Sequence, residues 1–159
     1  MPLVATALPA SGQGLIETHR VPADLAAEAV TTAVDACARQ GYPVTSILLD
    51  GDGILQAELR GDGAGIHTVQ MAHDKAYTAI SFRTDTSALV ARVEKRPSPA
   101  IAKLPNLILA PGGVVIMEGK EVIGAIAVSG VPNPTGDEVC AKAGLAKIGD
   151  RLNAAHSAK

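Results

Sequence analysis

Apolar residues recur at three- and four-residue steps in several stretches of the chain, and this period predicts amphipathic helices. Pro22 suits the first turn of the first helix, Gly41 lies just beyond its end, and Pro97 ends the third. On the second helix, Thr78 falls on the face opposite the apolar stripe. The helices are predicted over residues 22–40, 68–82, 84–96 and 135–152.

Between the helices, runs of β-branched and aliphatic residues predict short strands. The segment 50–53, Asp-Gly-Asp-Gly, separates the first two runs, and glycine accepts the positive φ that a tight hairpin turn needs. Gly124 interrupts the last run and marks a close approach of two backbones. The strands are predicted over residues 44–49, 54–59, 107–109, 114–117 and 122–128. The element order α-β-β-α-α-β-β-β-α predicts an α+β fold, a five-stranded antiparallel sheet with packed helices.

The length of 159 residues fits a single domain with a sizeable core, which we place at residues 21–153. Residues 1–20 show no periodicity and are predicted to be a flexible N-terminal tail, and residues 154–159 a C-terminal tail. The N-terminal segment lacks the basic region of a complete signal peptide. It is therefore either the start of a mature exported chain or a cytoplasmic tail.

Charge and composition argue against two classes of partner. The chain has 14 Lys+Arg and 16 Asp+Glu residues, no Trp, one Phe and two Tyr. A nucleic-acid binder normally has a clustered basic surface and aromatic side chains for stacking bases, so no nucleic-acid partner is expected. No window approaches the ~20 apolar residues of a membrane span.

A core so poor in aromatics buries little area per side chain, which favours a homo-oligomer.

Two cysteines, Cys37 and Cys140, fall on different predicted helices. They form a disulfide if the chain is exported, but two buried free thiols are the commoner outcome for such a pair. No CxxC or zinc-ligand spacing is present, so a structural metal site is not expected.

Histidines are the candidate metal ligands, because haem iron needs only one or two axial donors. His19 and His156 fall near the ends of the chain, whereas His67 and His73 flank the start of the second predicted helix. Both are candidate haem ligands, with His73 at the edge of the apolar stripe. Their six-residue spacing places them on different helix faces, which argues against one shared metal site. The commoner roles are a packing residue for His73 and a solvated one for His67.

A second set of polar residues predicts a catalytic pocket instead. Arg60 and Asp62 lie in a glycine-rich loop, and Lys75 and Tyr77 are a candidate proton-donor pair on the second helix. Gly112-Gly113, at a strand entrance, has backbone N–H groups that suit an anion. If the chain is an enzyme, Arg60, Asp62 and Lys75 are the candidate catalytic residues. Tyr77, Gly112 and Gly113 are candidate cofactor-binding residues. More commonly, residues such as Arg60 and Asp62 only form part of a loop, such a lysine is solvated, and a Gly-Gly pair only makes a turn.

Most of the chain, from about Leu25 to Leu145, resembles the GlcG/HbpS-like family of haem-degrading or haem-binding domains. The resemblance rests on many short segments in the family's order. They are Asp50-Gly-Asp-Gly53, Arg60-Gly-Asp-Gly-Ala64, Lys75-Ala-Tyr-Thr-Ala79, Thr86-Ser-Ala-Leu89, Gly112-Gly113, Val122-Ile-Gly-Ala-Ile126, Val128-Ser-Gly130 and Asp137-Glu138.

The resemblance implies a profilin-like fold, homo-oligomers up to octamers, and binding of haem or another tetrapyrrole. It also implies slow haem degradation or redox sensing as candidate activities. It does not fix an axial ligand, because relatives often lack histidine at position 73. The sequence around Cys37 and Cys140 resembles the exported branch of the family, which implies a periplasmic or secreted location, the alternative being cytoplasmic.

Three hypotheses follow for function. The first is an oligomeric haem-binding accessory protein. The second is a small-molecule enzyme (an isomerase, a lyase or an oxidative accessory activity) with a pocket around Arg60, Asp62, Lys75 and Gly112-Gly113. The third is a structural or signalling partner without a ligand.

Overall fold

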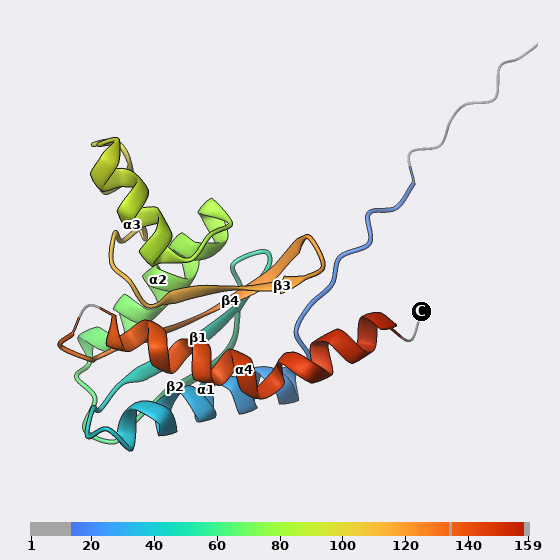
Figure 1. Ribbon diagram of the computed structural model, residues 1–159, viewed down its shortest axis with the longest axis horizontal. Helices are drawn as coiled ribbons and strands as arrows, with labels where there is room; N and C mark the ends of the chain where they lie inside the picture. The colour runs from blue at the N-terminus through green and yellow to red at the C-terminus, as the bar shows by residue number, and fades with distance from the viewer. Residues whose placement is uncertain (1–13, 134, 158–159) are drawn as a thin grey trace, which may run out of the picture.

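A four-stranded antiparallel sheet in the order β2-β1-β4-β3 forms the centre of the fold (Figure 1). This computed structural model describes residues 14–133 and 135–157 of the chain. The strands are β1 (Thr45–Asp50), β2 (Leu55–Arg60), β3 (Gly113–Glu118) and β4 (Glu121–Ser129). Because β1 pairs with β4, the first and last hairpins join in the middle of the sheet.

Helices cover both faces of this sheet. Helices α1 (Ala23–Ala38) and α4 (Gly136–Ser157) lie side by side on one face, and α2 (His67–Phe82) packs on the other (Figure 1). Helix α3 (Thr86–Lys95) projects away from the sheet beyond α2, and a short 3₁₀ helix, η1 (Ile101–Lys103), follows it. The α+β class and the helices expected from the apolar period are therefore confirmed.

The fifth strand predicted at residues 107–109 is wrong. These residues are irregular, and they follow Asn106, whose φ of 61° breaks an extended path. The backbone N–H of Ile108 donates to Oγ1 of Thr78 at 2.9 Å instead of to a neighbouring strand. This segment therefore crosses over α2, and it buries Thr78 on the helix face where the apolar pattern predicts exposure.

The core is divided by the sheet into two layers. Larger side chains such as Leu48, Ile126 and Val128 pack against α1 and α4. On the opposite face, Ala125 and Ala127 lie under an alanine stripe of α2, which comprises Ala72, Ala76 and Ala79. Since β1 and β4 are covered on both faces, every residue of β1 and most residues of β4 are buried, with no alternation between buried and exposed positions.

Gly124 allows the two central strands to approach each other, as its position inside the apolar run predicts. It pairs with Asp50, and a Cβ atom placed on it would lie 2.6 Å from the carbonyl oxygen of Leu49. Any larger residue would therefore push β4 away from β1.

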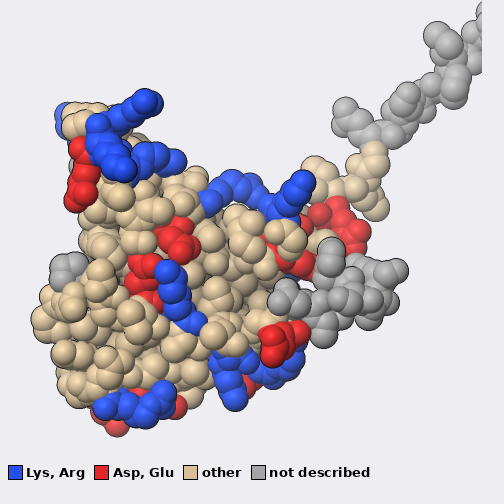
Figure 2. Space-filling model, in the orientation of Figure 1, with Lys and Arg blue, Asp and Glu red and all other residues tan. Residues whose placement is uncertain are grey.

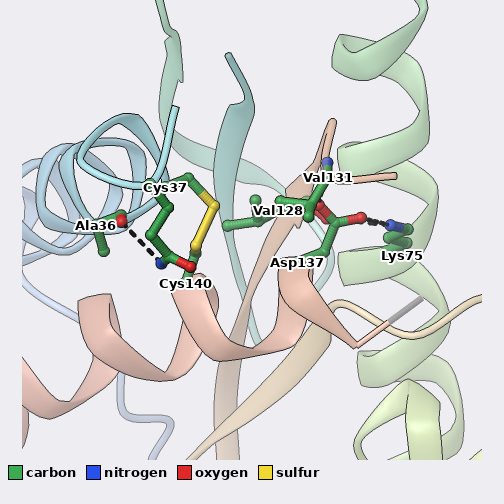
Figure 3. Close-up of a disulfide and its surroundings, with 8 residues drawn as sticks. Ala36, Cys37, Lys75, Val128, Val131, Asp137 and Cys140 are labelled. Atoms are coloured by element: carbon green, nitrogen blue, oxygen red, sulfur yellow. Dashed lines mark hydrogen bonds and ion pairs between the residues drawn. A yellow bond between two sulfur atoms is a disulfide. The ribbon is translucent and has the colours of Figure 1, made fainter. Parts of the chain in front are cut away.

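A disulfide between Cys37 and Cys140 joins α1 to α4 (Figure 3). Both cysteines are buried, so the bond lies within the core layer of that face. Of the two alternatives for the pair, the free thiols are therefore wrong.

The segment 14–22 runs past the ends of two hairpins. His19 Nδ1 lies 2.9 Å from Glu121 and 3.5 Å from Glu118, at the turn between β3 and β4. Arg20 binds Asp52, in the turn between β1 and β2, at 2.7 Å. None of the helices within residues 14–133 and 135–157 could span a lipid bilayer.

Candidate functional site

His73 lies on the outer side of α2, partly exposed, with its imidazole held from one side. Its Nδ1 atom is 3.3 Å from Oδ1 of Asp74, and that oxygen also accepts a 2.7 Å hydrogen bond from Gln70. In the neutral ring this contact places the proton on Nδ1 and leaves the lone pair on Nε2. Nε2 has no hydrogen-bond partner within residues 14–133 and 135–157, so it is available to a metal.

Tyr77 connects His73 to an apolar groove. The two rings stack with their centroids 6.2 Å apart and an interplanar angle of 14°. The groove has a volume of ≈ 360 Å³ and crosses the C-terminal half of α2. It is lined by Tyr77, Ser81, Phe82, Leu104, Pro105 and Leu107. A flat apolar molecule would find two of the chain's few aromatic rings here.

His67 is placed apart from this groove. It is exposed at the first residue of α2, and its ring lies close to Gly65, where an added Cβ would be 2.7 Å from the imidazole. Within the described part of the chain, no three His, Cys, Asp or Glu side chains are grouped as a metal-ion site. If either histidine bound haem iron, the imidazole would therefore be the one protein ligand at that place.

Lys75 is buried, with 3 % of its surface exposed, and binds Asp137 at the start of α4 (Figure 3). Its Nζ donates to Oδ2 of Asp137 at 2.6 Å and to the carbonyl of Val128 at 3.2 Å. The other carboxylate oxygen accepts the backbone N–H of Val131 at 2.9 Å. The lysine is therefore neither solvated nor paired with Tyr77, and it holds together elements from both faces of the sheet.

Gly112 and Gly113 both lie against Lys75, too close for a larger residue at either position. A Cβ on Gly112 would lie 3.0 Å from Nζ of Lys75, and one on Gly113 would lie 2.4 Å from the carbonyl oxygen of Lys75. The N–H of Gly113 donates to Oγ1 of Thr86 at 3.0 Å. The space left by the glycines is filled by the chain itself, which accounts for the residue type at both positions.

Arg60 and Asp62 lie in a different place, on a cavity of ≈ 290 Å³ near the C-terminal end of α1. Tyr42 and Asp35 also line it. The buried Lys75 and the two glycines do not line this cavity. The residues of the enzyme hypothesis are thus divided between two locations.

Within the described part of the chain, the pKa values of Glu121 and Lys142 are shifted by surface contacts away from the groove. The hydrogen bond from His19 lowers the pKa of Glu121, helped by the nearby charges of His19 and Arg83. The Glu138 carboxylate, four residues earlier on α4, raises the pKa of Lys142. Neither group takes part in the candidate site.

Two residues in these arrangements were not among the sequence candidates. Asp74 follows His73 directly, and a carboxylate next to a candidate ligand is a signal that the sequence already contained. In the sequence, Asp137 belongs only to the segment Asp137-Glu138 that resembles the family, because its partner Lys75 is 62 residues away. Only the fold brings that pair together.

Comparison with known proteins places the chain among haem-related proteins. Residues 21–146 match the family model described as haem degrading protein HbpS-like. The crystal structure of HbpS superimposes with a TM-score of 0.80 at 30% identity, covering 89% of this chain and 99% of that chain. A double mutant of HbpS from Streptomyces reticuli gives the same score and identity over 91% and 99%. The PduOC:haem complex shares the fold, with a TM-score of 0.74 at 21% identity over 80% and 94%. Among curated proteins, none is significantly similar in sequence.

Proposed function

The chain belongs to the HbpS-like family of haem-degrading proteins, and from this premise we propose that it is an oligomeric haem-binding accessory protein. The observation that carries the proposal is the His73 imidazole beside the apolar groove, oriented by Asp74 with Nε2 open. The related HbpS and the PduOC:haem complex support haem as the ligand.

The residues present fit a haem bound on the surface. His73 would donate its Nε2 lone pair to the iron, and Asp74 would hold the Nδ1 proton, as carboxylates commonly do for metal-bound imidazoles. Tyr77, Phe82 and Leu104 would exclude water from one face of the macrocycle. When bound, haem supplies an iron centre that undergoes redox change. A groove that covers one face leaves the other accessible, which supports redox sensing and slow haem degradation as the associated activities.

Self-association belongs to the same proposal. Leu55 on β2, Ile54 before it and Ile66 before α2 are 49 %, 62 % and 77 % exposed. Large apolar side chains exposed to this degree gain from burial against another subunit. We expect a homo-oligomer by light scattering coupled to size exclusion, and a monomer at all concentrations would contradict this part.

We further propose that the chain works in an oxidising compartment, the periplasm or the exterior, and not in the cytoplasm. The Cys37–Cys140 disulfide supports this location, since such bonds form and persist mainly outside the reducing cytosol. Alkylation of free thiols in cell fractions tests it. Modification of both cysteines in protein taken from the native host would overturn it.

Haem titration tests the binding site. We expect the unsubstituted protein to shift the Soret band of added haem, and His73→Ala to lose the ligand-dependent shift. His67→Ala is the matched control, because that exposed ring lies away from the groove. Retention of the full shift in His73→Ala would refute the site, and no shift in the unsubstituted protein would refute haem binding.

A further inference from the structure

The apolar groove has different chemistry at its two margins. His73, stacked on Tyr77, borders one side. At Phe82, a groove residue five positions further along α2, the guanidinium carbon of Arg92 on α3 lies 6.0 Å from the ring centroid. This cation–π contact keeps a positive charge at the groove while the guanidinium donors remain exposed to solvent.

Further basic residues extend the charge beyond Arg92. Arg96 follows at the end of α3, its N–H bonded to the carbonyl of Arg92 at 3.0 Å, and Lys103 directly precedes Leu104 of the groove. Figure 2 shows Lys and Arg side chains gathered over the projecting end of α3. The basic margin, which we define as Arg92, Arg96 and Lys103, is exposed throughout.

Acidic side chains near the basic margin do little to neutralise it. Glu94 is two positions from Arg92, which places it on nearly the opposite side of α3. Asp85 accepts the backbone N–H of Val115 at 3.0 Å and lies 3.8 Å from Lys142 of α4, so it is already engaged. The chain as a whole has a net charge of −2, so the excess of positive charge at this margin is local.

We propose that Arg92, supported by Arg96, binds the carboxylate groups of the flat ligand whose apolar ring lies in the groove. This inference rests on the proposed function, and for haem the carboxylates are the two propionates. Arginine suits the role because its planar donors match a carboxylate in a bidentate manner, which a lysine cannot do. The groove thereby recognises an amphipathic ring with a defined orientation: apolar over Tyr77 and Phe82, acidic towards α3.

Metal-free protoporphyrin IX separates this role from iron ligation. Fluorescence titration of the full chain would compare protoporphyrin IX with its dimethyl ester, which keeps the ring and lacks the carboxylate charges. We expect the free acid to bind about three- to tenfold more tightly than the ester, the range for exposed charge-assisted contacts. The double variant Arg92→Gln/Arg96→Gln should bind the acid only as tightly as the ester, with its affinity for the ester unchanged.

Two controls make the outcome specific. Lys120→Gln removes an exposed charge at the β3–β4 turn and should leave the preference for the acid intact. His73→Ala should also keep this preference, because no iron is present, while losing affinity for haem. The inference is overturned, and the proposed function is not, if the unsubstituted protein binds acid and ester equally or if the double variant still prefers the acid. If the unsubstituted protein binds none of haem, protoporphyrin IX and the ester, both the proposed function and the inference are overturned.

Discussion

The ammonium of Lys75 lies 2.6 Å from the carboxylate of Asp137, although one residue belongs to α2 and the other to α4, on opposite faces of the sheet. The pair closes the end of β4, where Lys75 also binds the carbonyl of Val128. Both side chains are almost fully buried, so each depends on the other for neutralisation.

Removal of either partner should destabilise the fold strongly. Lys75→Met and Asp137→Asn are each expected to lower the free energy of unfolding by about 3–5 kcal/mol. The first leaves the buried carboxylate without its cation, and the second leaves the buried ammonium without its anion. The double variant Lys75→Met/Asp137→Asn should cost less than the sum of the two. Urea unfolding followed by circular dichroism measures these costs. Lys142→Met, which removes an exposed partner of Glu138, should cost no more than about 1 kcal/mol. Equal costs for Lys75→Met and Lys142→Met would contradict this account.

Close approach of α2 to β3 depends on Gly113. Gly113→Ala places a methyl group against the carbonyl of Lys75 and Cγ2 of Thr86, so we expect a loss of about 1–3 kcal/mol from overpacking. Gly149→Ala on α4 meets no atom within 4 Å and should stabilise the helix by up to about 1 kcal/mol. Thermal unfolding of the two variants should thus move in opposite directions, and a neutral Gly113→Ala would show that the backbones can separate.

The disulfide should contribute more to stability than a local contact does, because it closes a loop with a sequence separation of 103 residues. The double variant Cys37→Ala/Cys140→Ala is expected to lose about 2–5 kcal/mol. Denaturant unfolding with and without a reductant provides the internal check, since the double variant should be insensitive to the reductant. Identical unfolding of the oxidised and reduced native protein would contradict the expectation.

Contact between His19 and Glu121 predicts an acid-dependent loosening of the segment 14–22. The folded state holds the pKa of Glu121 below its ordinary value of 4.5, so the folded state binds this proton less readily than the unfolded state does. The stabilisation is therefore present above that ordinary value and is lost as the pH falls through the lower, folded pKa. NMR titration of the Glu121 carboxyl carbon should show a midpoint that rises towards 4.5 in His19→Ala. Superimposable titrations in the two proteins would exclude the contact as the cause.

Asp74 should matter for haem although it does not reach the iron. Asp74→Ala frees the His73 ring to change tautomer and orientation, so haem affinity is expected to fall by about 10- to 100-fold while His73 remains in place. Asp74→Asn keeps an oxygen acceptor and should recover part of the loss. Soret titration gives the dissociation constants, and Asp62→Asn, on a separate cavity, serves as the control. An unchanged affinity in Asp74→Ala would remove Asp74 from the site.

The sequence predicted the local elements well, because helix period, hairpin turns and breaker residues are local signals. The pattern around Asp50–Gly53 predicted its hairpin, and Gly124 predicted a close approach of two backbones, which the structure shows between β4 and β1. The strand predicted at 107–109 is wrong because a short apolar run alone cannot distinguish a strand from a segment that covers a helix. The path over Thr78 depends on one long-range hydrogen bond that no local pattern encodes.

The candidate site could be predicted only in part, for a related reason. His73 and Tyr77 were separate candidates on one predicted helix, and their four-residue spacing brings the two rings together in the structure. Lys75, two residues from each in sequence, faces the interior because its partner comes from the distant α4. Arg92 was not a candidate, since its place beside Phe82 depends on how α3 turns back after residue 83.

Pairing of β1 with β4 has a consequence for the order in which the molecule is completed during synthesis. A ribosome makes β1 and Cys37 more than seventy residues before their partners β4 and Cys140. Until then, β1 has only β2 beside it and its other edge is open. The free edge of β1 therefore stays unpaired until most of the chain has been synthesised. Premature termination between residues 60 and 121 would leave β1 with an unpaired edge that is prone to aggregation.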